Sequence, residues 1–338
     1  MEHYISQEPI HQARRKNSRM GLSLCIIGVL AMCLSTLCTM VLPSIFLMDG
    51  KANMEELVKA KPWILWMIGF FPLYIAAPFG IYLMRKTPST KIEEHALGLG
   101  KLLMYFVMCV PILFLGSIIS NVIQKLVSGT EAINPLEHVA NQGYLVKTLF
   151  LVIIAPVLEE FIFRKTIIDR TVQYGEKMAI FFSGLTFGLF HINLSQFFFA
   201  FGLGLFFAYI YVRTGRLRYV IILHIAVNFM GTILAPMTMS KVHPDELNSF
   251  MENIAQGLKG PLPEGIQPFL YYLIYFFSMV AIGTVLWIIQ RKNFHLQETE
   301  QQVPKGQRLK VMFGNVGVPL FLIYSLTFII RSIILAMH

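Results

Sequence analysis

Apolar runs of roughly 18 residues or more recur along almost the whole chain, and they constrain the fold more than any other feature. Such runs cross a bilayer as helices, because a helix satisfies its own backbone hydrogen bonds in lipid. The pattern therefore predicts an all-α polytopic membrane protein, a bundle of eight or nine transmembrane helices. The predicted spans are 21–47, 63–84, 99–123, 144–164, 177–192, 195–212, 218–238, 267–290 and 313–336.

Composition and charge agree with a membrane protein. Only 14% of the 338 residues are charged, whereas soluble domains carry about 25%. The net charge of +9 comes from basic residues at alternate ends of the spans, so it is a topology signal and no nucleic-acid partner is expected. The lack of eukaryotic targeting signals favours a bacterial plasma membrane. The N-terminus is predicted in the cytoplasm because basic residues precede the first span: Arg14, Arg15, Lys16 and Arg19.

Two further predictions concern the longest loop and the cysteines. The longest extramembrane loop is predicted at 239–266. The cysteines show no metal-ligand spacing and are interpreted as small core residues within apolar helices. They are Cys25, Cys33, Cys38 and Cys109.

Three of the predicted spans carry polar residues that a lipid-facing helix would not keep. The fourth span holds Glu159, Glu160 and Arg164, although each charge costs at least a few kcal/mol inside a membrane. The fifth ends with His191, and the seventh holds His224 and Asn228. Ionisable residues at such depth indicate a functional site.

Helical spacing assigns these residues to faces. Glu160 and Arg164 are four residues apart, so they are predicted to form an ion pair within one helix. Glu159 is turned by about 100° from Glu160 and needs a partner on another helix. His224 and Asn228 are also four residues apart and face one point. Counted at about 1.5 Å per residue from the cytoplasmic turns, the three helices bring these groups to overlapping depths.

Two chemical interpretations fit this set. In the first, Glu159 and a histidine polarise a water that attacks an amide carbonyl, while Asn228 and a histidine N–H stabilise the oxyanion. In the second, Glu159, His191 and His224 hold a zinc ion, as a His₂Glu set does in metallohydrolases. The HExxH spacing of the best-known zinc peptidases is absent. Water activation by glutamate, with no cofactor, is therefore the preferred interpretation.

The same residues resemble three motifs of a known family. Residues 159–164 read EEFIFR, 187–191 read FGLFH and 224–228 read HIAVN. They resemble the EExxxR, FxxxH and HxxxN motifs of the CAAX protease and bacteriocin-processing family, also called Abi, of intramembrane glutamic endopeptidases. The motifs come in the family's order on three separate apolar helices.

The resemblance implies a helical-bundle protease in which Glu159 activates water. His191, His224 and Asn228 correspond to the other motif residues of the site, and Glu160 and Arg164 to a supporting pair. Substrates would be hydrophobic or lipidated peptides or proteins at the bilayer, as in CAAX tail removal or bacteriocin-leader processing. The predicted division is an N-terminal segment with three helices at 1–143, a protease core at 144–237, and a loop with C-terminal helices at 238–338.

Non-enzymatic hypotheses remain beside this one. A membrane immunity or binding protein, or an ion-coupled transporter, also tolerates buried glutamate and histidine. A transporter more often shows internal repeats or paired broken helices, and the sequence shows neither. A scaffold protein has no reason to keep Glu159 without a basic partner on its own helix.

Overall fold

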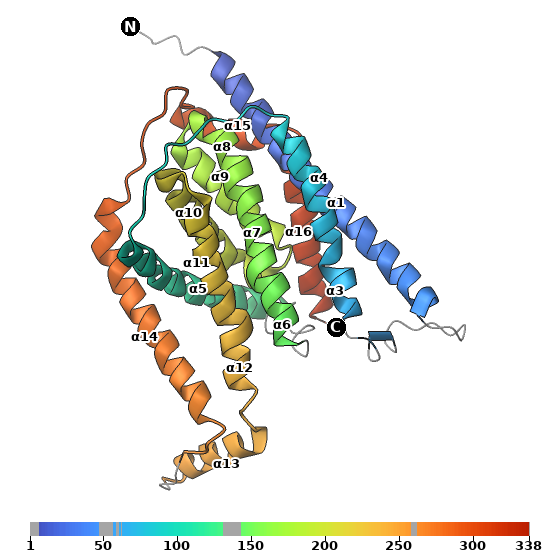
Figure 1. The fold of residues 1–338 in the computed structure, drawn as a ribbon, viewed down its shortest axis with the longest axis vertical. Helices are drawn as coiled ribbons and strands as arrows, with labels where there is room; N and C mark the ends of the chain where they lie inside the picture. The colour runs from blue at the N-terminus through green and yellow to red at the C-terminus, as the bar shows by residue number, and fades with distance from the viewer. Residues whose placement is uncertain are drawn as a thin grey trace.

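The computed structural model describes residues 7–46, 57–58, 61, 63–130, 143–257 and 262–337, and these parts of the chain form helices and connections with no strand. Position 47, the last of the first predicted span, lies outside the described residues. Figure 1 shows the arrangement of the helices. The longer helices are α1 (Gln7–Phe46), α4 (Phe71–Arg85), α5 (Leu99–Ser128), α9 (Glu176–Phe190), α10 (Leu194–Thr214), α11 (Leu217–Phe229), α13 (Pro244–Ala255), α14 (Gln267–Gln290) and α16 (Gly317–Leu335).

Shorter elements complete and connect these helices. α3 (Ile64–Gly69) precedes α4, and α15 (Arg308–Phe313) precedes α16. Two rods mix α and π geometry. The first joins α6 (Tyr144–Lys147), η2 (Thr148–Ile154), α7 (Ala155–Glu160), η3 (Phe161–Ile168) and α8 (Asp169–Thr171), and ends in the 3₁₀ turn η4 (Val172–Tyr174). The second extends α11 through η5 (Met230–Leu234) into α12 (Ala235–Met239).

The described part of the chain contains seven helices that are long and apolar enough to cross a membrane. The protein is thus an all-α polytopic membrane protein, but the prediction of eight or nine spans was too high. The predicted spans at 144–164 and 177–192 are the two that do not qualify. The first carries too many charged residues. The second corresponds to α9, which has only 15 residues. At 1.5 Å per residue its length is about 23 Å, whereas the hydrocarbon core is about 30 Å thick.

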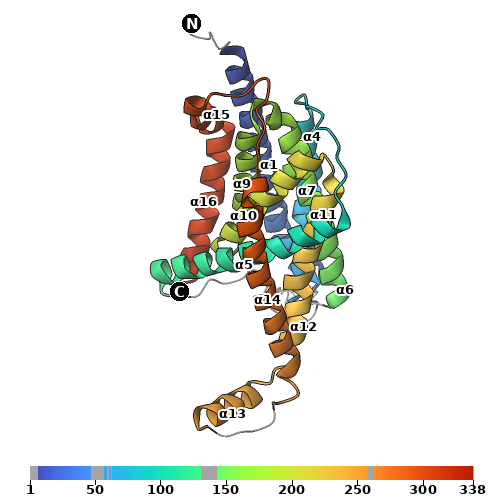
Figure 2. The same ribbon diagram turned by 90° about the vertical axis from the view of Figure 1, so that its left-hand side faces the viewer.

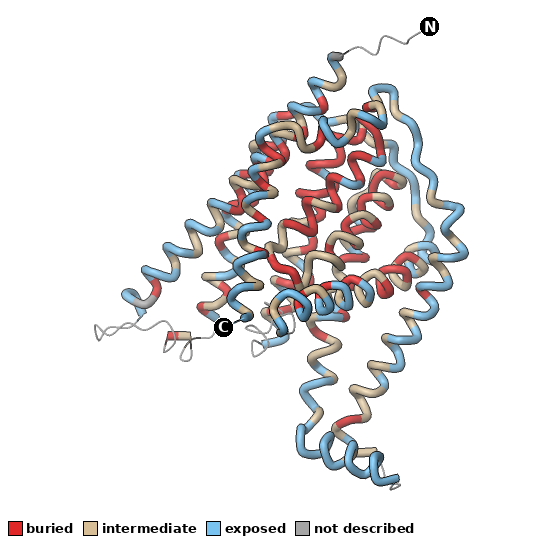
Figure 3. Tube along the Cα trace, turned by 180° about the vertical axis from the view of Figure 1, so that it is seen from behind, coloured by how far each residue is buried: buried red, intermediate tan, exposed pale blue. Residues whose placement is uncertain are grey.

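These two non-qualifying segments lie inside the bundle. Helix α9 packs along α10 and against the rod of residues 144–171, and α5 crosses α10 and α14. Figure 2 shows α5 running across the other helices at a steep angle. Buried residues concentrate on the central helices, whereas α1 and α14 are largely exposed along their outer faces (Figure 3). The polar segments are therefore shielded from lipid by the more apolar helices.

The close contact of α9 with α10 follows from glycines. A Cβ on Gly184 would lie 2.9 Å from the backbone nitrogen of Leu205, and one on Gly188 would lie 2.9 Å from Cβ of Phe201. Small residues four apart on one helix allow two backbones to approach in this way. The stripe thus fixes the position of α9, and with it the position of His191 at its end.

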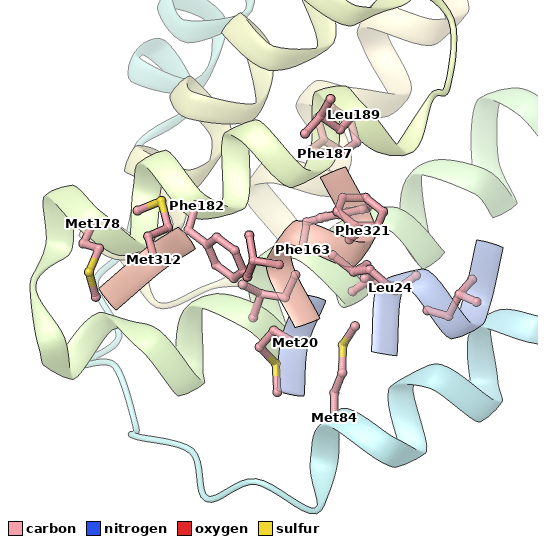
Figure 4. Close-up of a cluster of buried hydrophobic side chains, with 14 of the residues drawn as sticks. Met20, Leu24, Met84, Phe163, Met178, Phe182, Phe187, Leu189, Met312 and Phe321 are labelled. Atoms are coloured by element: carbon pink, nitrogen blue, oxygen red, sulfur yellow. The ribbon is translucent and has the colours of Figure 1, made fainter. Parts of the chain in front are cut away.

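A cluster of buried apolar side chains packs around the rod. Phe163 on η3 packs edge-on against Phe187 on α9, with ring centroids 5.2 Å apart. Met20 and Leu24 of α1 and Phe321 of α16 belong to the same cluster (Figure 4). The first and last helices thus both contribute to the packing around the segment that carries the two glutamates.

The loop predicted at 239–266 is partly helical, and Glu176 makes contacts at the opposite end of the molecule that the sequence did not predict. The predicted loop 239–266 contains α13, a helix whose apolar residues Leu247, Met251 and Ile254 are exposed at the tip of the molecule; residues 258–261 lie outside the description. At the opposite end, the Glu176 carboxylate pairs with Arg213 and accepts a hydrogen bond from the Gln297 N–H at 2.6 Å.

The four cysteines are free thiols. Cys109 is fully buried, as predicted, and Cys25 and Cys38 are partly buried. Cys33 is exposed on α1, so its interpretation as a core residue was wrong. Its apolar stretch of helix faces outward, where a membrane-spanning helix meets lipid rather than protein.

Candidate active site

The two glutamates sit on a helix whose geometry changes around them. The α-helical turn α7 lies between two π-helical segments, η2 and η3. Proline explains the first of these, because it has no N–H and its ring clashes with the carbonyl four residues earlier. With Pro156 at the start of α7, the Ala155 N–H donates to Phe150 O, five residues back. π-helical segments occur frequently at functional sites.

Glu160 and Arg164 form the ion pair that their spacing predicts. Arg164 Nε lies 3.1 Å from Glu160 Oε2, and both side chains have an exposed fraction of 0%. The guanidinium also stacks on the Phe187 ring, 4.5 Å from its centroid. A fully desolvated charge is stable only with such a partner. The arginine therefore keeps a carboxylate at position 160 inside the bundle.

Glu160 has a second partner that the sequence analysis did not anticipate. His224 Nδ1 lies 2.9 Å from Glu160 Oε1. An ionised carboxylate only accepts hydrogen bonds, so Nδ1 carries the hydrogen and the Glu160 carboxylate orients the ring. The other ring nitrogen, Nε2, faces Glu159, with 3.7 Å between Nε2 and Glu159 Oε2. One imidazole thus connects the two neighbouring carboxylates.

Glu159 is the accessible member of the two glutamates. Its side chain is 17% exposed, compared with 0% for Glu160. Among the ion pairs of the described residues it has no arginine or lysine partner, and the pair that it makes there is with His224. A carboxylate with this exposure and a nearby imidazole is available to a water molecule, whereas Glu160 is not.

His191 lies at the end of α9, where the backbone turns sharply. Its Nδ1 is 2.9 Å from Phe187 O, and because a carbonyl only accepts, Nδ1 carries the hydrogen. Nε2 of the neutral ring is then an acceptor. The next residue, Ile192, has φ of 50°, which is strained for a β-branched side chain. Asn193 follows and caps α10 by accepting a hydrogen bond from the Gln196 N–H at 2.9 Å.

Phe187 connects the two histidines. Its ring lies edge-on to His191 with centroids 5.0 Å apart, and edge-on to His224 with centroids 5.7 Å apart. Phe207 on α10 contacts His224 at 5.6 Å. These rings form an apolar wall that limits the motion of both imidazoles. The motif phenylalanine thus contacts both histidines and Arg164 at once.

Asn228 makes a contact that the sequence analysis did not predict. Its Nδ2 donates to the backbone carbonyl of Leu151 at 2.9 Å. One of its two amide hydrogens is therefore used inside the protein.

The zinc interpretation receives no support from side-chain positions. Within the described ranges, no group of three or more histidine, cysteine, aspartate or glutamate side chains is placed to hold a metal ion. Glu159, His191 and His224 therefore do not form a ready ligand set.

Fold and site define the class: a polytopic membrane protein with a carboxylate–imidazole site enclosed by its helices. Residues 141–230 match the model of the family described as Rce1-like, type II CAAX prenyl endopeptidase Rce1-like. The match spans all three motif segments and confirms the family resemblance. No curated protein and no solved structure matches the chain significantly. The family is one of CAAX-type intramembrane proteases, which makes a peptide-bond hydrolase the class of enzyme to test.

Proposed function

We propose that this protein is an intramembrane endopeptidase in which Glu159 activates water to hydrolyse membrane-associated peptides or proteins. The observation that carries the proposal is the contrast between adjacent carboxylates. Glu160 is neutralised and fully buried, whereas Glu159 is partly exposed and faces an imidazole that Glu160 orients. A general base needs an accessible, correctly placed carboxylate, and Glu159 meets that requirement.

Each residue has a distinct part in the proposed reaction. Glu159 and the free Nε2 of His191 accept the two hydrogens of a bound water. Glu159 takes one proton as the water oxygen attacks the peptide carbonyl carbon, and it later gives that proton to the leaving amine as the C–N bond breaks. His224, whose ring Glu160 orients through Nδ1, donates from Nε2 to the developing oxyanion. Arg164 stays paired with the Glu160 carboxylate throughout.

The substrate class follows from where the site lies. Glu159, His191 and His224 sit on segments surrounded by membrane-spanning helices. A substrate must therefore present its scissile bond from the bilayer or from its surface. Hydrophobic or lipidated peptides meet this condition, and both CAAX tails and bacteriocin leaders are peptides of that type.

The test uses the purified protein in nanodiscs with a pooled library of hydrophobic and leader-like peptides, read by mass spectrometry. We expect cleavage by the wild type, persistence with a strong chelator, and a loss of at least about a hundredfold in Glu159→Gln, since the general base alone contributes about 10²–10⁴. Glu252→Gln, on the exposed helix α13, is the matched control and should cleave as the wild type does.

Other outcomes would assign the site differently. Loss of cleavage with chelator and its return with zinc would replace water activation by a metal mechanism. Equal behaviour of wild type and Glu159→Gln, with both folded, would contradict the proposal and favour an immunity or binding protein.

A further inference from the structure

The apolar face of helix α13 is left exposed by the described part of the chain. Leu247, Met251 and Ile254 are spaced i, i+4 and i+7, so they form one stripe along this helix. Their exposed fractions are 37%, 56% and 54%. An exposed apolar stripe rimmed by polar residues marks a surface that contacts a partner or a membrane.

The opposite face of α13 is polar and acidic. Asp245, Ser249 and Glu252 repeat the same spacing two positions earlier. Two steps of about 100° place them on the side of the helix away from the apolar stripe. The sequence of α13 contains no lysine or arginine. The helix therefore has one face suited to an apolar environment and one suited to water, and it has no cation that would attract an anionic surface.

The segments on both sides of α13 are membrane spans. The span Leu217–Met239 ends five positions before Pro244, and α14 begins at Gln267. The first has 23 residues and α14 has 24. At about 1.5 Å per residue their lengths are about 35 and about 36 Å, slightly more than a hydrocarbon core of about 30 Å. Both spans therefore leave the hydrocarbon close to these ends, and α13 begins at the bilayer surface.

The direction of α13 agrees with this position. Figures 1 and 2 both show α13 running across the direction of α12 and α14 at one end of the molecule. A helix that lies across two spans at the bilayer surface runs along the membrane plane. An amphipathic helix in that orientation buries its apolar face about 5–10 Å into the boundary between headgroups and acyl chains.

We propose that α13 is an interfacial helix, which inserts the stripe of Leu247, Met251 and Ile254 into the lipid surface and keeps its acidic stripe in water. The partner is a zwitterionic lipid surface, because the contact is apolar and the helix offers only negative charge. The helix then anchors the connection between α12 and α14 to the bilayer. This role is independent of peptidase activity.

The experiment uses the full chain without its four native cysteines, one molecule per nanodisc of phosphatidylcholine. A single new cysteine carries a polarity-sensitive fluorophore, and lipids with brominated acyl chains serve as the quencher. Met251→Cys reports on the apolar stripe, and its neighbour Glu252→Cys is the matched control on the polar stripe. We expect a blue-shifted emission for Met251→Cys and quenching at least about twofold stronger than for Glu252→Cys, because insertion by about 5–10 Å brings only the apolar stripe to the acyl chains.

Leu247→Cys and Ser249→Cys repeat the comparison on the same two stripes, and all four positions are exposed, so the labels do not disturb a packed core. Equal quenching on both faces would overturn the proposal. A blue shift for Met251→Cys without quenching by brominated lipid would also overturn it, because protein, such as a second copy of the chain, and not lipid would then cover the stripe.

Discussion

At the scale of single residues, Glu159 and Glu160 are identical side chains whose surroundings assign them different tasks. Glu160 contacts Arg164 and His224 and has no exposed surface. The Glu159 side chain keeps an exposed fraction of 17%, and its Oε2 lies 3.7 Å from His224 Nε2. The turn of about 100° between neighbours on a helix is enough to separate a supporting carboxylate from an accessible one.

Arg164 provides a stability prediction at this scale. Arg164→Ala leaves the Glu160 carboxylate buried without its cation, which is expected to destabilise the fold by about 3–5 kcal/mol. Glu160→Gln is expected to lower folded yield as well, because it leaves the buried arginine without a charge partner. Thermal unfolding and monodisperse yield in detergent measure both effects.

The control for this prediction lies one residue further along the same helix. Lys165 and Asp169 form another i, i+4 pair at 3.0 Å, but the lysine side chain is 49% exposed. Lys165→Ala should cost no more than about 1 kcal/mol, as exposed pairs do. Normal yield and unfolding temperature in Arg164→Ala and Glu160→Gln would refute the assignment of a structural pair.

At the scale of helices, the site depends on departures from regular α geometry. The rod of residues 144–171 changes from α to π and back, and α9 ends in a turn with Ile192 at φ of 50°. The change from α7 to η3 comes directly after Glu160, and Ile192 directly follows His191. Regular helices present their side chains at fixed angular intervals. These irregularities change the directions of Glu159 and His191, which come from different segments, toward His224 on α11.

The glycine contact between α9 and α10 gives a prediction for this scale. Gly184→Ala places a Cβ 2.8 Å from Leu205 Cδ2 and 2.9 Å from Leu205 N. The backbone nitrogen cannot move aside, so overpacking of about 1–3 kcal/mol is expected, with a lower unfolding temperature. Gly100→Ala on α5 is the control, because a Cβ there meets nothing within 4 Å. An equal effect of the two substitutions would contradict the packing role of Gly184.

At the scale of the whole molecule, charge is distributed between two ends. The start of α1, α8 and α15 lie at one end in Figure 1, and α13 lies at the other. Arg14 belongs to the first part of α1 and Arg308 to α15, so both elements bring basic residues to the first end. The positive-inside rule therefore predicts that the first end faces the cytoplasm.

Labelling of intact cells tests this orientation. In a variant without the four native cysteines, Glu252→Cys on α13 should react with a membrane-impermeant maleimide from outside. Gln301→Cys, in the connection at the opposite end, should react only after permeabilisation. The reverse pattern would invert the topology and move the N-terminus out of the cytoplasm.

The fold class and the Glu160–Arg164 ion pair could be predicted from local sequence patterns. The long apolar runs determined an all-α membrane protein, because hydrocarbon admits helices and excludes open backbone. The i, i+4 spacing determined the Glu160–Arg164 pair, because both groups lie on one helix and need no tertiary partner. The number of spans was overestimated, since the segment 144–164 is too rich in charged residues and α9, at 15 residues, is too short to qualify.

Contacts between helices were decided by the tertiary structure. His224 bonds to Glu160, 64 residues away, and both histidines contact the Phe187 ring. Asn228 donates to Leu151 O. All of these contacts depend on how α9 and α11 lie against the rod. Spacing along one helix carries no information on its register against another. The sequence by itself therefore determined which residues are polar inside the membrane, and only the packing decided which of the two glutamates is left accessible.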